Sequence, residues 1–347
     1  MTLQNYLYIK LRNAVRIGLL LLAWLTSPQV HAESTTPNDD FIMHHIQDAH
    51  EWHLATIGHT HLTLPLPVII GSPDRGLEIF SSSRLKDAHY RRVTYRGYRL
   101  TPNGKIVASD PKRVFYDLSI TKNVAAMLVS VGVLLALALT AARHYQRKPQ
   151  APPRGFWAFL EVMVLFVRDD IAIPNIGKKK YQRFMPYLLT VFFFIWLNNL
   201  LGLLPGAANV TGNISITLVL ALFTFVLTNL NGNRQYWGHI FNTPGVPRWL
   251  APIMIPVELL GLLTKPFSLM IRLFANITAG HIILLSIIGL IFTLKSPWVG
   301  LISVPFGAGM FLLKLLVAFL QACIFTLLSA IYFGAAVESH HEEKASS

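Results

Sequence analysis

A single arginine stands inside a long apolar stretch in the C-terminal third of the sequence. Residues 265–293 read KPFSLMIRLFANITAGHIILLSIIGLIFT, and Arg272 lies within them. A run of this length is sufficient to cross a bilayer. A cation in the hydrocarbon core costs about 3 kcal/mol on insertion scales, so such residues usually face a protein interior or a water-filled path. The stretch therefore predicts a membrane helix with a functional charge. The alternative is an arginine near a helix end whose side chain extends to the membrane–water interface.

At 100° per residue, Arg272 shares a helix face with mostly small or polar side chains. The members of this arginine face are Ser268, Arg272, Asn276, Ala279, Ile283 and Ser286. Only Ile283 is bulky and apolar. Because small side chains let another helix approach closely, the pattern predicts a partner helix against the arginine.

The composition of the whole chain also indicates a membrane protein. Hydrophobic residues make up 53% and charged residues only 14%, against about 25% charged in a typical soluble domain. The net charge of +13 would be compatible with nucleic-acid binding. However, the basic residues are dispersed between apolar segments, as membrane topology requires. We therefore expect a lipid membrane and no nucleic acid as partner. Cys323 is the only cysteine, which excludes an intrachain disulfide.

The first residues have the pattern of a secretory signal. Lys10, Arg12 and Arg16 precede a short apolar run at 17–24, and Val-His-Ala follows at 30–32. Basic, apolar and small-residue regions in this order predict a cleaved signal peptide over residues 1–32, so that the mature chain begins at Glu33 outside the cytoplasm. The alternative is a retained first helix, but the apolar run is short for a span.

Residues 33–117 form a polar, histidine-rich extension. Thr-Pro-Asn-Gly at 101–104 lies between YRGYRL and KIVA, which predicts a β-hairpin and hence a small extracytoplasmic cap with β-structure. The pairs His50-x-x-His53 and His59-x-His61 are potential metal ligands. No cysteine joins them and their spacing fits no closed zinc module, so we expect no metal site.

Five apolar segments in the remaining chain predict an all-α protein with five membrane crossings. They are residues 122–142, 187–204, 214–230, 266–293 and 305–337. The basic flank after the first span marks the cytoplasmic side. Residues 155–173 mix apolar and charged side chains, which favours an interfacial helix. This topology places the extension outside and the C-terminus in the cytoplasm.

The last two segments are longer than a bilayer requires. As helices they would measure roughly 42 and 50 Å, against about 30 Å of hydrocarbon. Ordinary tilts average only about 20°, so we expect two steeply oblique helices that form a hairpin at Lys295–Pro297.

An ordered set of motifs resembles subunit a of F-type ATP synthases. IRLFANITAGH follows Pro256-Val257-Glu258 and precedes Leu320-Gln321-Ala322, while Asn199 and Leu203-Leu204-Pro205 stand in an earlier span. The resemblance covers most of the predicted membrane domain, residues 118–347. It implies a stator subunit beside the c-ring, held by b-type peripheral stalk subunits in a bacterial-type inner membrane. It implies no cofactor and no catalytic site of the chain's own: the subunit would couple proton flow to ring rotation and ATP synthesis.

The resemblance also assigns roles to single residues. Arg272 matches the family's barrier arginine, which faces the c-ring carboxylates between two half-channels. Its guanidinium stays protonated, so it can attract a carboxylate without relaying a proton. The candidate channel residues are Asn276, His281, Lys314, Gln321, Glu258, Asn199 and Asn213. Interhelical hydrogen bonding is the alternative role for the amide side chains.

The chain departs from the commonest family pattern at one pair of positions. Relatives more often hold an acid and a histidine where His281 and Lys314 stand. His281 can relay protons near neutral pH. Lys314 is either a neutral, desolvated amine or a fixed positive charge on a hydrated wall. A carboxylate-assisted relay at this pair is therefore in question.

Two other classes of protein remain as alternatives. A secondary transporter would use Arg272 to bind an anionic substrate, but it predicts internal repeats, and none is visible. A membrane metallohydrolase would use the histidine-rich extension. Neither accounts for the ordered motifs around Arg272.

Overall fold

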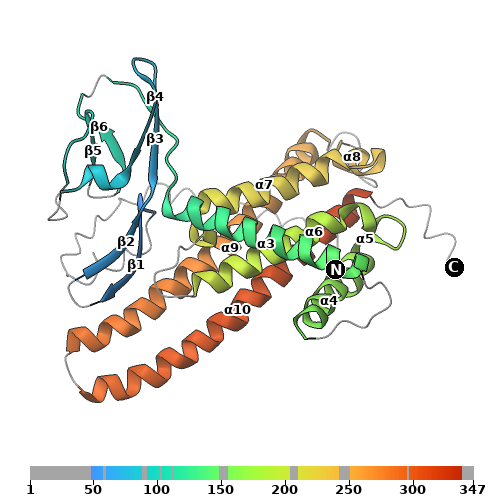
Figure 1. Ribbon diagram of the computed structural model, residues 1–347. Coiled ribbons are helices and arrows are strands. Elements are labelled where there is room, and N and C mark those ends of the chain that lie inside the picture. Colours follow the sequence, from blue (N-terminus) through green and yellow to red (C-terminus); the bar gives the residue numbers. More distant parts are fainter. Residues whose placement is uncertain are drawn as a thin grey trace, which may run out of the picture. The chain divides into compact units, whose positions relative to one another are not determined.

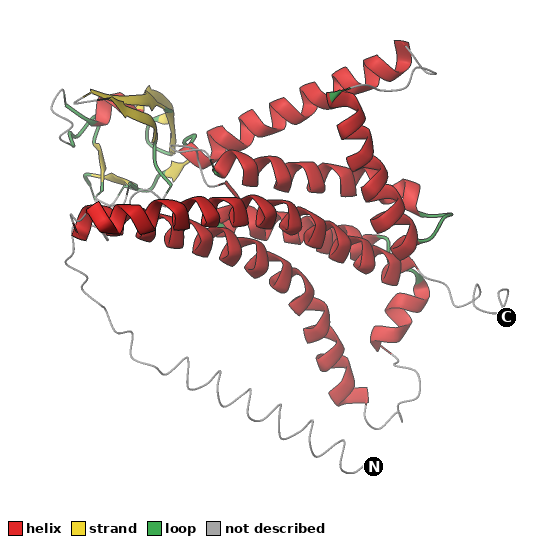
Figure 2. Cartoon of the chain, turned by 90° about the horizontal axis from the view of Figure 1, so that it is seen from below, coloured by secondary structure: helices red, strands yellow, loops and turns green. Residues whose placement is uncertain are grey.

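The structure is a computed structural model that describes residues 48–57, 60–87, 92–101, 104–110, 113–147, 155–203, 210–241, 251–294 and 297–337. Strands are confined to its N-terminal part, and the rest is helical (Figures 1 and 2). The expected signal peptide over residues 1–32 and the start at Glu33 lie outside the described residues.

In the described part of the extension, seven short strands form three small sheets. β1 (Glu51–Ile57) pairs with β2 (Thr60–Pro65), β3 (Pro67–Ser72) lies between β4 (Gly76–Ser81) and β7 (Tyr116–Asp117), and β5 (Tyr98–Leu100) pairs with β6 (Ile106–Ala108). All pairs are antiparallel. The strand pair predicted on both sides of Thr101–Gly104 is thus present as β5 and β6.

Alternation along β3 builds the core of the extension. Val68 and Ile70 are fully buried, as is Tyr98 of β5. Phe80, Leu85 and Ile106 complete the cluster. Because side chains alternate across a strand, the residues between the buried ones must point to the opposite side of the sheet.

Backbone hydrogen bonds join the extension directly to the first long helix, α3 (Lys122–Arg147). The amide of Lys122 donates to the carbonyl of Ala49 over 2.8 Å. The amide of Asn123 donates to Oδ1 of Asp48 over 3.1 Å. A carboxylate at a helix N-terminus satisfies a free amide and interacts favourably with the helix dipole. Asp48 therefore supplies the cap that the local sequence of α3 does not.

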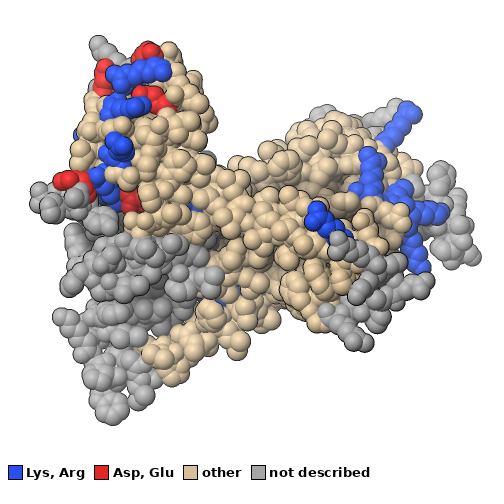
Figure 3. All heavy atoms as spheres, viewed as in Figure 1, with Lys and Arg blue, Asp and Glu red and all other residues tan. Residues whose placement is uncertain are grey.

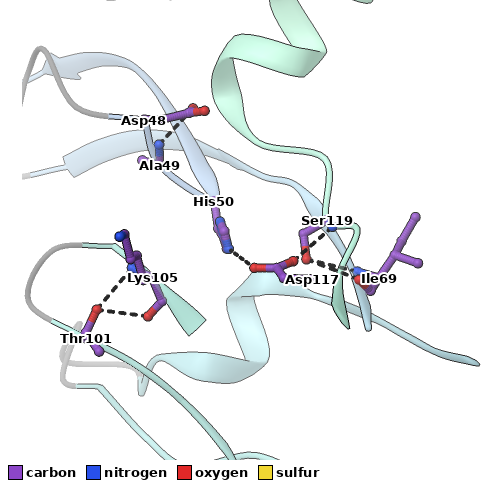
Figure 4. A network of polar contacts seen from close by, with 8 residues as sticks. All are labelled: Asp48, Ala49, His50, Ile69, Thr101, Lys105, Asp117 and Ser119. Atoms are coloured by element: carbon purple, nitrogen blue, oxygen red, sulfur yellow. Dashed lines mark hydrogen bonds and ion pairs between the residues drawn. The ribbon is translucent and has the colours of Figure 1, made fainter. Parts of the chain in front are cut away.

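His50 is buried beside this junction, among acidic groups (Figure 4). Its Nε2 lies 3.5 Å from Oδ2 of Asp117. Burial lowers the pKa of His50, and the nearby charges of Asp117, Asp48 and Glu51 oppose this effect without overcoming it. The imidazole is therefore neutral in the folded extension at neutral pH.

We expect the extension to lose stability as the pH falls below about 6.5, the usual pKa of a histidine. The unfolded chain then binds a proton that the folded extension resists, so stability is complete above pH 6.5 and declines below it. The measurement is amide hydrogen exchange at Val68 and Ile70 at pH 7.5 and 5.5, corrected for intrinsic rates. The His50→Gln variant should lack this pH dependence. An equal loss of protection in both proteins would contradict the assignment to His50.

Ten helical segments follow the extension within the described residues. They are α3, α4 (Phe156–Phe166), the π-helical turn η2 (Val167–Ala172), α5 (Ile173–Ile176), α6 (Tyr181–Gly202), the short 3-10 turn η3 (Val210–Gly212), α7 (Ile214–Leu230), α8 (Arg234–Phe241), α9 (Ala251–Leu294) and α10 (Pro297–Val337). The bounds predicted for residues 214–230 are confirmed by α7. In contrast, α6 begins six residues before the expected Tyr187, because Pro186 lies inside the helix.

Four of the described helices are long and apolar enough to cross a membrane: α3, α6, α9 and α10. The pair α7 and α8, bent by 102°, would make a fifth span if counted as one. The view in Figure 3 shows no charged side chains over the middle of the helical part, while Lys and Arg gather near one end. The count of five crossings and the interfacial position of residues 155–173 stay predictions.

The two last helices are longer than the sequence indicated. α9 has 44 residues and α10 has 41, or roughly 66 and 62 Å at 1.5 Å per residue. The helices are longer than expected because they do not begin at Pro266 and Pro305. Both lie inside helices, as does Pro256. Membrane helices tolerate proline where neighbouring groups satisfy the freed carbonyls. α9 ends at Leu294 and α10 begins at Pro297, so the helix ends agree with the predicted position of the turn, whose residues 295 and 296 lie outside the described part.

A glycine sets the closest approach between two helical segments. A Cβ at Gly334 of α10 would overlap the backbone carbonyl of Asn175 in α5. Phe333, its neighbour, is fully buried and stacks on Phe184 of α6 with ring centroids 4.7 Å apart. Gly334 thus allows α10 to reach both segments.

Candidate functional site

Three charged residues lie along one side of α9. Glu258, Lys265 and Arg272 follow one another at intervals of seven residues, so their side chains share a face over about 21 Å. All three are half-buried. Within the part of the chain that the structure describes, none of them forms an ion pair shorter than 4 Å. The arginine is therefore free to act on a group from outside these residues.

The arginine face is open. Its members Ser268, Asn276, Ala279, Ile283 and Ser286 are exposed, and Arg272 is half-buried. The bulky residues of the same region, Leu269, Met270 and Leu273, are buried in the bundle instead. The helix thus packs with its apolar side and leaves the small and polar side uncovered by the described residues.

On the N-terminal side of Arg272, α9 meets the end of α10. Nζ of Lys265 lies 5.4 Å from the ring centroid of Tyr332, a cation–π contact. A cavity of about 10 Å³ adjoins Lys265 and Tyr332, close to the size that one water molecule needs. Its polar lining consists of Thr224, Thr228, Asn229, Tyr236, Lys265 and Tyr332.

On the other side, Asn199 joins three segments. Its Oδ1 accepts a hydrogen bond from Oγ1 of Thr211 in η3 over 2.7 Å, and its Nδ2 donates to the carbonyl of Ala318 in α10 over 3.3 Å. Gln321 lies one helical turn beyond Ala318 and is only 4% exposed. The structure therefore brings Asn199 and Gln321 into one buried polar region between α6 and α10.

Lys314 is buried two turns before Gln321 on the same side of α10, with 9% of its surface exposed. Its Nζ forms no hydrogen bond within the described residues. Its Cε would lie 3.2 Å from a Cβ at Gly280. Gly280 thus makes room for the lysine chain on α9. Lys314 and Gln321 are seven residues apart in α10, so they share a helix face, and both are buried.

Not all predicted site residues gather here. The side chain of Asn213 accepts from the amide of Ser215 over 2.9 Å and caps α7. Glu258 stands four turns from Arg272. His281 directly follows Gly280 in α9, but its side chain lies outside the described part.

The structure also contains a buried cluster of hydroxyl groups that is not among the predicted site residues. The hydroxyl of Tyr187 in α6 is 2.8 Å from Oγ1 of Thr224 in α7, which is 3.5 Å from Oγ of Ser329 in α10. The signal in the sequence is the spacing of Thr217, Thr224 and Thr228, which places small hydroxyl side chains on one face of α7. The cluster extends polar contacts through the bundle toward the cavity at Thr224.

The histidines of the extension form no recognisable metal centre within the described residues, where no group of three potential ligands comes together. The side chains of His53, His59 and His61 lie outside the described part. The expectation of no metal site stays a prediction.

The fold and the site define an α-helical, multi-pass membrane protein that holds charged and polar side chains between its helices. The sequence profile described as ATP synthase A chain matches residues 124–334. The chain therefore belongs to the ATP synthase subunit a family. A second profile, described only as a domain of unknown function, matches residues 41–125.

Comparison with individual proteins supports the same family. ATP synthase subunit a of Anaeromyxobacter dehalogenans (strain 2CP-C) is 48% identical over 235 residues, which cover 65% of this chain and 60% of that protein. The subunit of Anaeromyxobacter sp. (strain Fw109-5) is 39% identical over 314 residues, or 87% and 72% of the two chains. That of Myxococcus xanthus (strain DK1622) is 49% identical over 234 residues, or 65% and 76%. The match thus spans less than two thirds of the first of these relatives.

Proposed function

We propose that this chain is the proton-translocating stator subunit in the membrane sector of an ATP synthase. The observation that carries the proposal is Arg272, half-buried on a face of α9 that the described residues leave open. A permanently charged guanidinium there can attract a deprotonated carboxylate on a passing c subunit and cannot itself relay the proton. It would thus separate two half-channels.

The polar groups on the two sides of Arg272 support two separate paths. Glu258, Lys265 and the small cavity beside Tyr332 precede it along α9 and would belong to the cytoplasmic path. Asn199, Gln321, Lys314 and His281, with Asn276 between them and the arginine, would belong to the other. Asn213 would contribute mainly by capping α7. A membrane potential supplies about 2.3 kcal/mol per charge per 100 mV, which the offset paths would convert into ring rotation.

The same proposal fixes partners and placement. The chain would contact the c-ring and b-type peripheral stalk subunits in a bacterial-type inner membrane, as part of a proton-transporting two-sector ATPase without a catalytic site or cofactor of its own. Residues 1–32 would be removed as a signal peptide. Residues 33–117 would lie on the periplasmic side, and the membrane domain, 118–347, would end in the cytoplasm.

Isolation of the intact assembly tests this function. A tag on the chain should co-purify a ring of small hairpin proteins and an ATPase head, and inverted vesicles should acidify on addition of ATP. A secondary transporter would purify without them and bind an anionic substrate through Arg272. A metallohydrolase of the extension would retain activity after detergent removes all other subunits. Either result would reject the proposal.

A further test concerns Lys314 and His281. Because the lysine chain packs on Gly280, next to His281, its positive charge should disfavour protonation of the imidazole. We expect Lys314→Gln to shift the pH profile of ATP-driven proton pumping toward higher pH. The shift should vanish in the His281→Gln background, where nothing titrates in that range. An equal shift with and without His281 would show that the two residues are not coupled.

A further inference from the structure

The three-stranded sheet of the extension has an unusual distribution of side chains. Its inner face carries Val68 and Ile70 of β3 together with Glu78 of β4 and Asp117 of β7. Glu78 accepts a hydrogen bond from the hydroxyl of Tyr98 over 3.1 Å. The acidic residues of these strands therefore point toward the core of the extension, although an exposed sheet in water normally has the reverse arrangement.

The opposite side of the sheet is apolar and uncovered. The register places Ile69 of β3 opposite Ile79 of β4, and Gly71 between Leu77 of β4 and Tyr116 of β7. The amide of Leu118 donates to the carbonyl of Ile69. These six residues, Ile69, Gly71, Leu77, Ile79, Tyr116 and Leu118, form what we call the outer apolar face.

The exposure of this face is high. Leu77, Ile79, Tyr116 and Leu118 are exposed by 64%, 59%, 67% and 64%. No charged residue belongs to the face, whereas charged side chains gather elsewhere on the extension in the view of Figure 3. Contiguous apolar surface of this kind in a folded protein marks an interaction site.

The outer apolar face lies close in the chain to the candidate membrane span of α3. Leu118 stands only four residues before Lys122, where the apolar span of α3 begins, so at most about 14 Å of extended chain separates the two. The first half of α3 exposes Leu128, Val129 and Val131, as expected for side chains that face lipid. Hydrogen bonds from Leu118 and Ile120 hold this connection against β3. The sheet is thus fixed at the point where the chain enters the bilayer.

We propose that the outer apolar face rests on the lipid surface of the bilayer beside the start of α3. Tyr116 suits this position, because tyrosine concentrates where apolar and aqueous phases meet. The extension would then be seated on the membrane, with Glu78 and Asp117 on the side of the sheet that faces away from the lipid. This inference concerns the extension alone and does not depend on the role of Arg272.

Spin labels on the full chain test the proposal. The complex is reconstituted in nanodiscs of phosphatidylethanolamine and phosphatidylglycerol, with Cys323→Ser as background. Leu77→Cys, Ile79→Cys and Tyr116→Cys are labelled one at a time, and Ser83→Cys and Arg99→Cys serve as controls at exposed positions outside the face. Because all five replaced side chains are exposed, we expect the fold to be retained.

Collision rates with oxygen, which dissolves in lipid, and with a water-soluble nickel chelate give the result. We expect the ratio of oxygen to chelate collisions to be several-fold higher at Leu77, Ile79 and Tyr116 than at the two controls. A ratio equal to that of the controls would show that water covers the face. Low collision rates with both reagents would show that a protein partner covers it. Either outcome would overturn the proposal.

Discussion

Replacing Arg272 by alanine should abolish ATP-driven proton pumping while the complex still assembles. The arginine face of α9 is open, and the neighbouring residues Leu269 and Leu273 are buried in the bundle instead, so removal of the guanidinium costs little packing. Without a fixed positive charge, the proposed c-ring carboxylate would lose its partner and the two proposed paths would lose their barrier. The measurement is acidification of inverted vesicles, together with the subunit content of the purified complex.

Arg272→Lys should also reduce pumping to near background. An ammonium is a compact charge that loses its proton more readily and cannot present a planar set of donors. Ser268→Ala, one turn away on the same face, is the matched control and should retain activity. Normal pumping by the lysine variant would remove Arg272 from the proposed role. Loss of assembly in the alanine variant would show that the residue is structural.

Gly334→Ala should strongly impair folding and assembly of the chain. The added methyl group would overlap the carbonyl oxygen of Asn175, and a backbone atom cannot rotate away as a side chain can. Overpacking of this kind costs about 1–3 kcal/mol, occasionally more, and α10 would have to move away from both α5 and α6. We expect a lower yield of membrane-inserted chain. We also expect the detergent-solubilised complex to dissociate at a lower temperature.

Gly309→Ala provides the control for this variant. Gly309 lies in the same helix, but a Cβ there meets no atom within 4 Å. Alanine is the better helix former by about 1 kcal/mol, so this variant should be neutral or slightly stabilising. If Gly334→Ala matched Gly309→Ala in yield and thermal stability, the close approach of α10 to Asn175 would be wrong.

The apolar segments of the membrane domain could be predicted from local sequence, but not all of their ends. The bounds of α7 agree with the predicted apolar segment, and in the structure Asn213 caps its first turn. α9 and α10 were predicted too short, since a proline normally disfavours a helix interior. This preference is derived from helices in water. In a bundle, neighbouring helices compensate for the missing hydrogen bond.

The site was predictable in its residue types and not in its contacts. Family resemblance singled out Asn199 and Gln321 but gave no reason to join Asn199 to Ala318, 119 positions away. The charge of Lys314 within an apolar segment marks it as a candidate site residue. Its packing against Gly280, however, depends on how α9 and α10 cross. The hydroxyl cluster of Tyr187, Thr224 and Ser329 carries no charge and so has little weight in a sequence. Crossing helices decide these contacts, and the local pattern does not encode the crossing.

The cap that Asp48 places on α3 has a consequence for the order of biosynthesis. The bond from Asn123 to Asp48 joins positions 75 residues apart, and the residues between them include all the described strands. α3 can enter the bilayer as soon as it is made, but its first turn obtains this partner only after the extension has folded. Completion of the N-terminal turn of α3 therefore requires that the preceding extension has already reached its native fold.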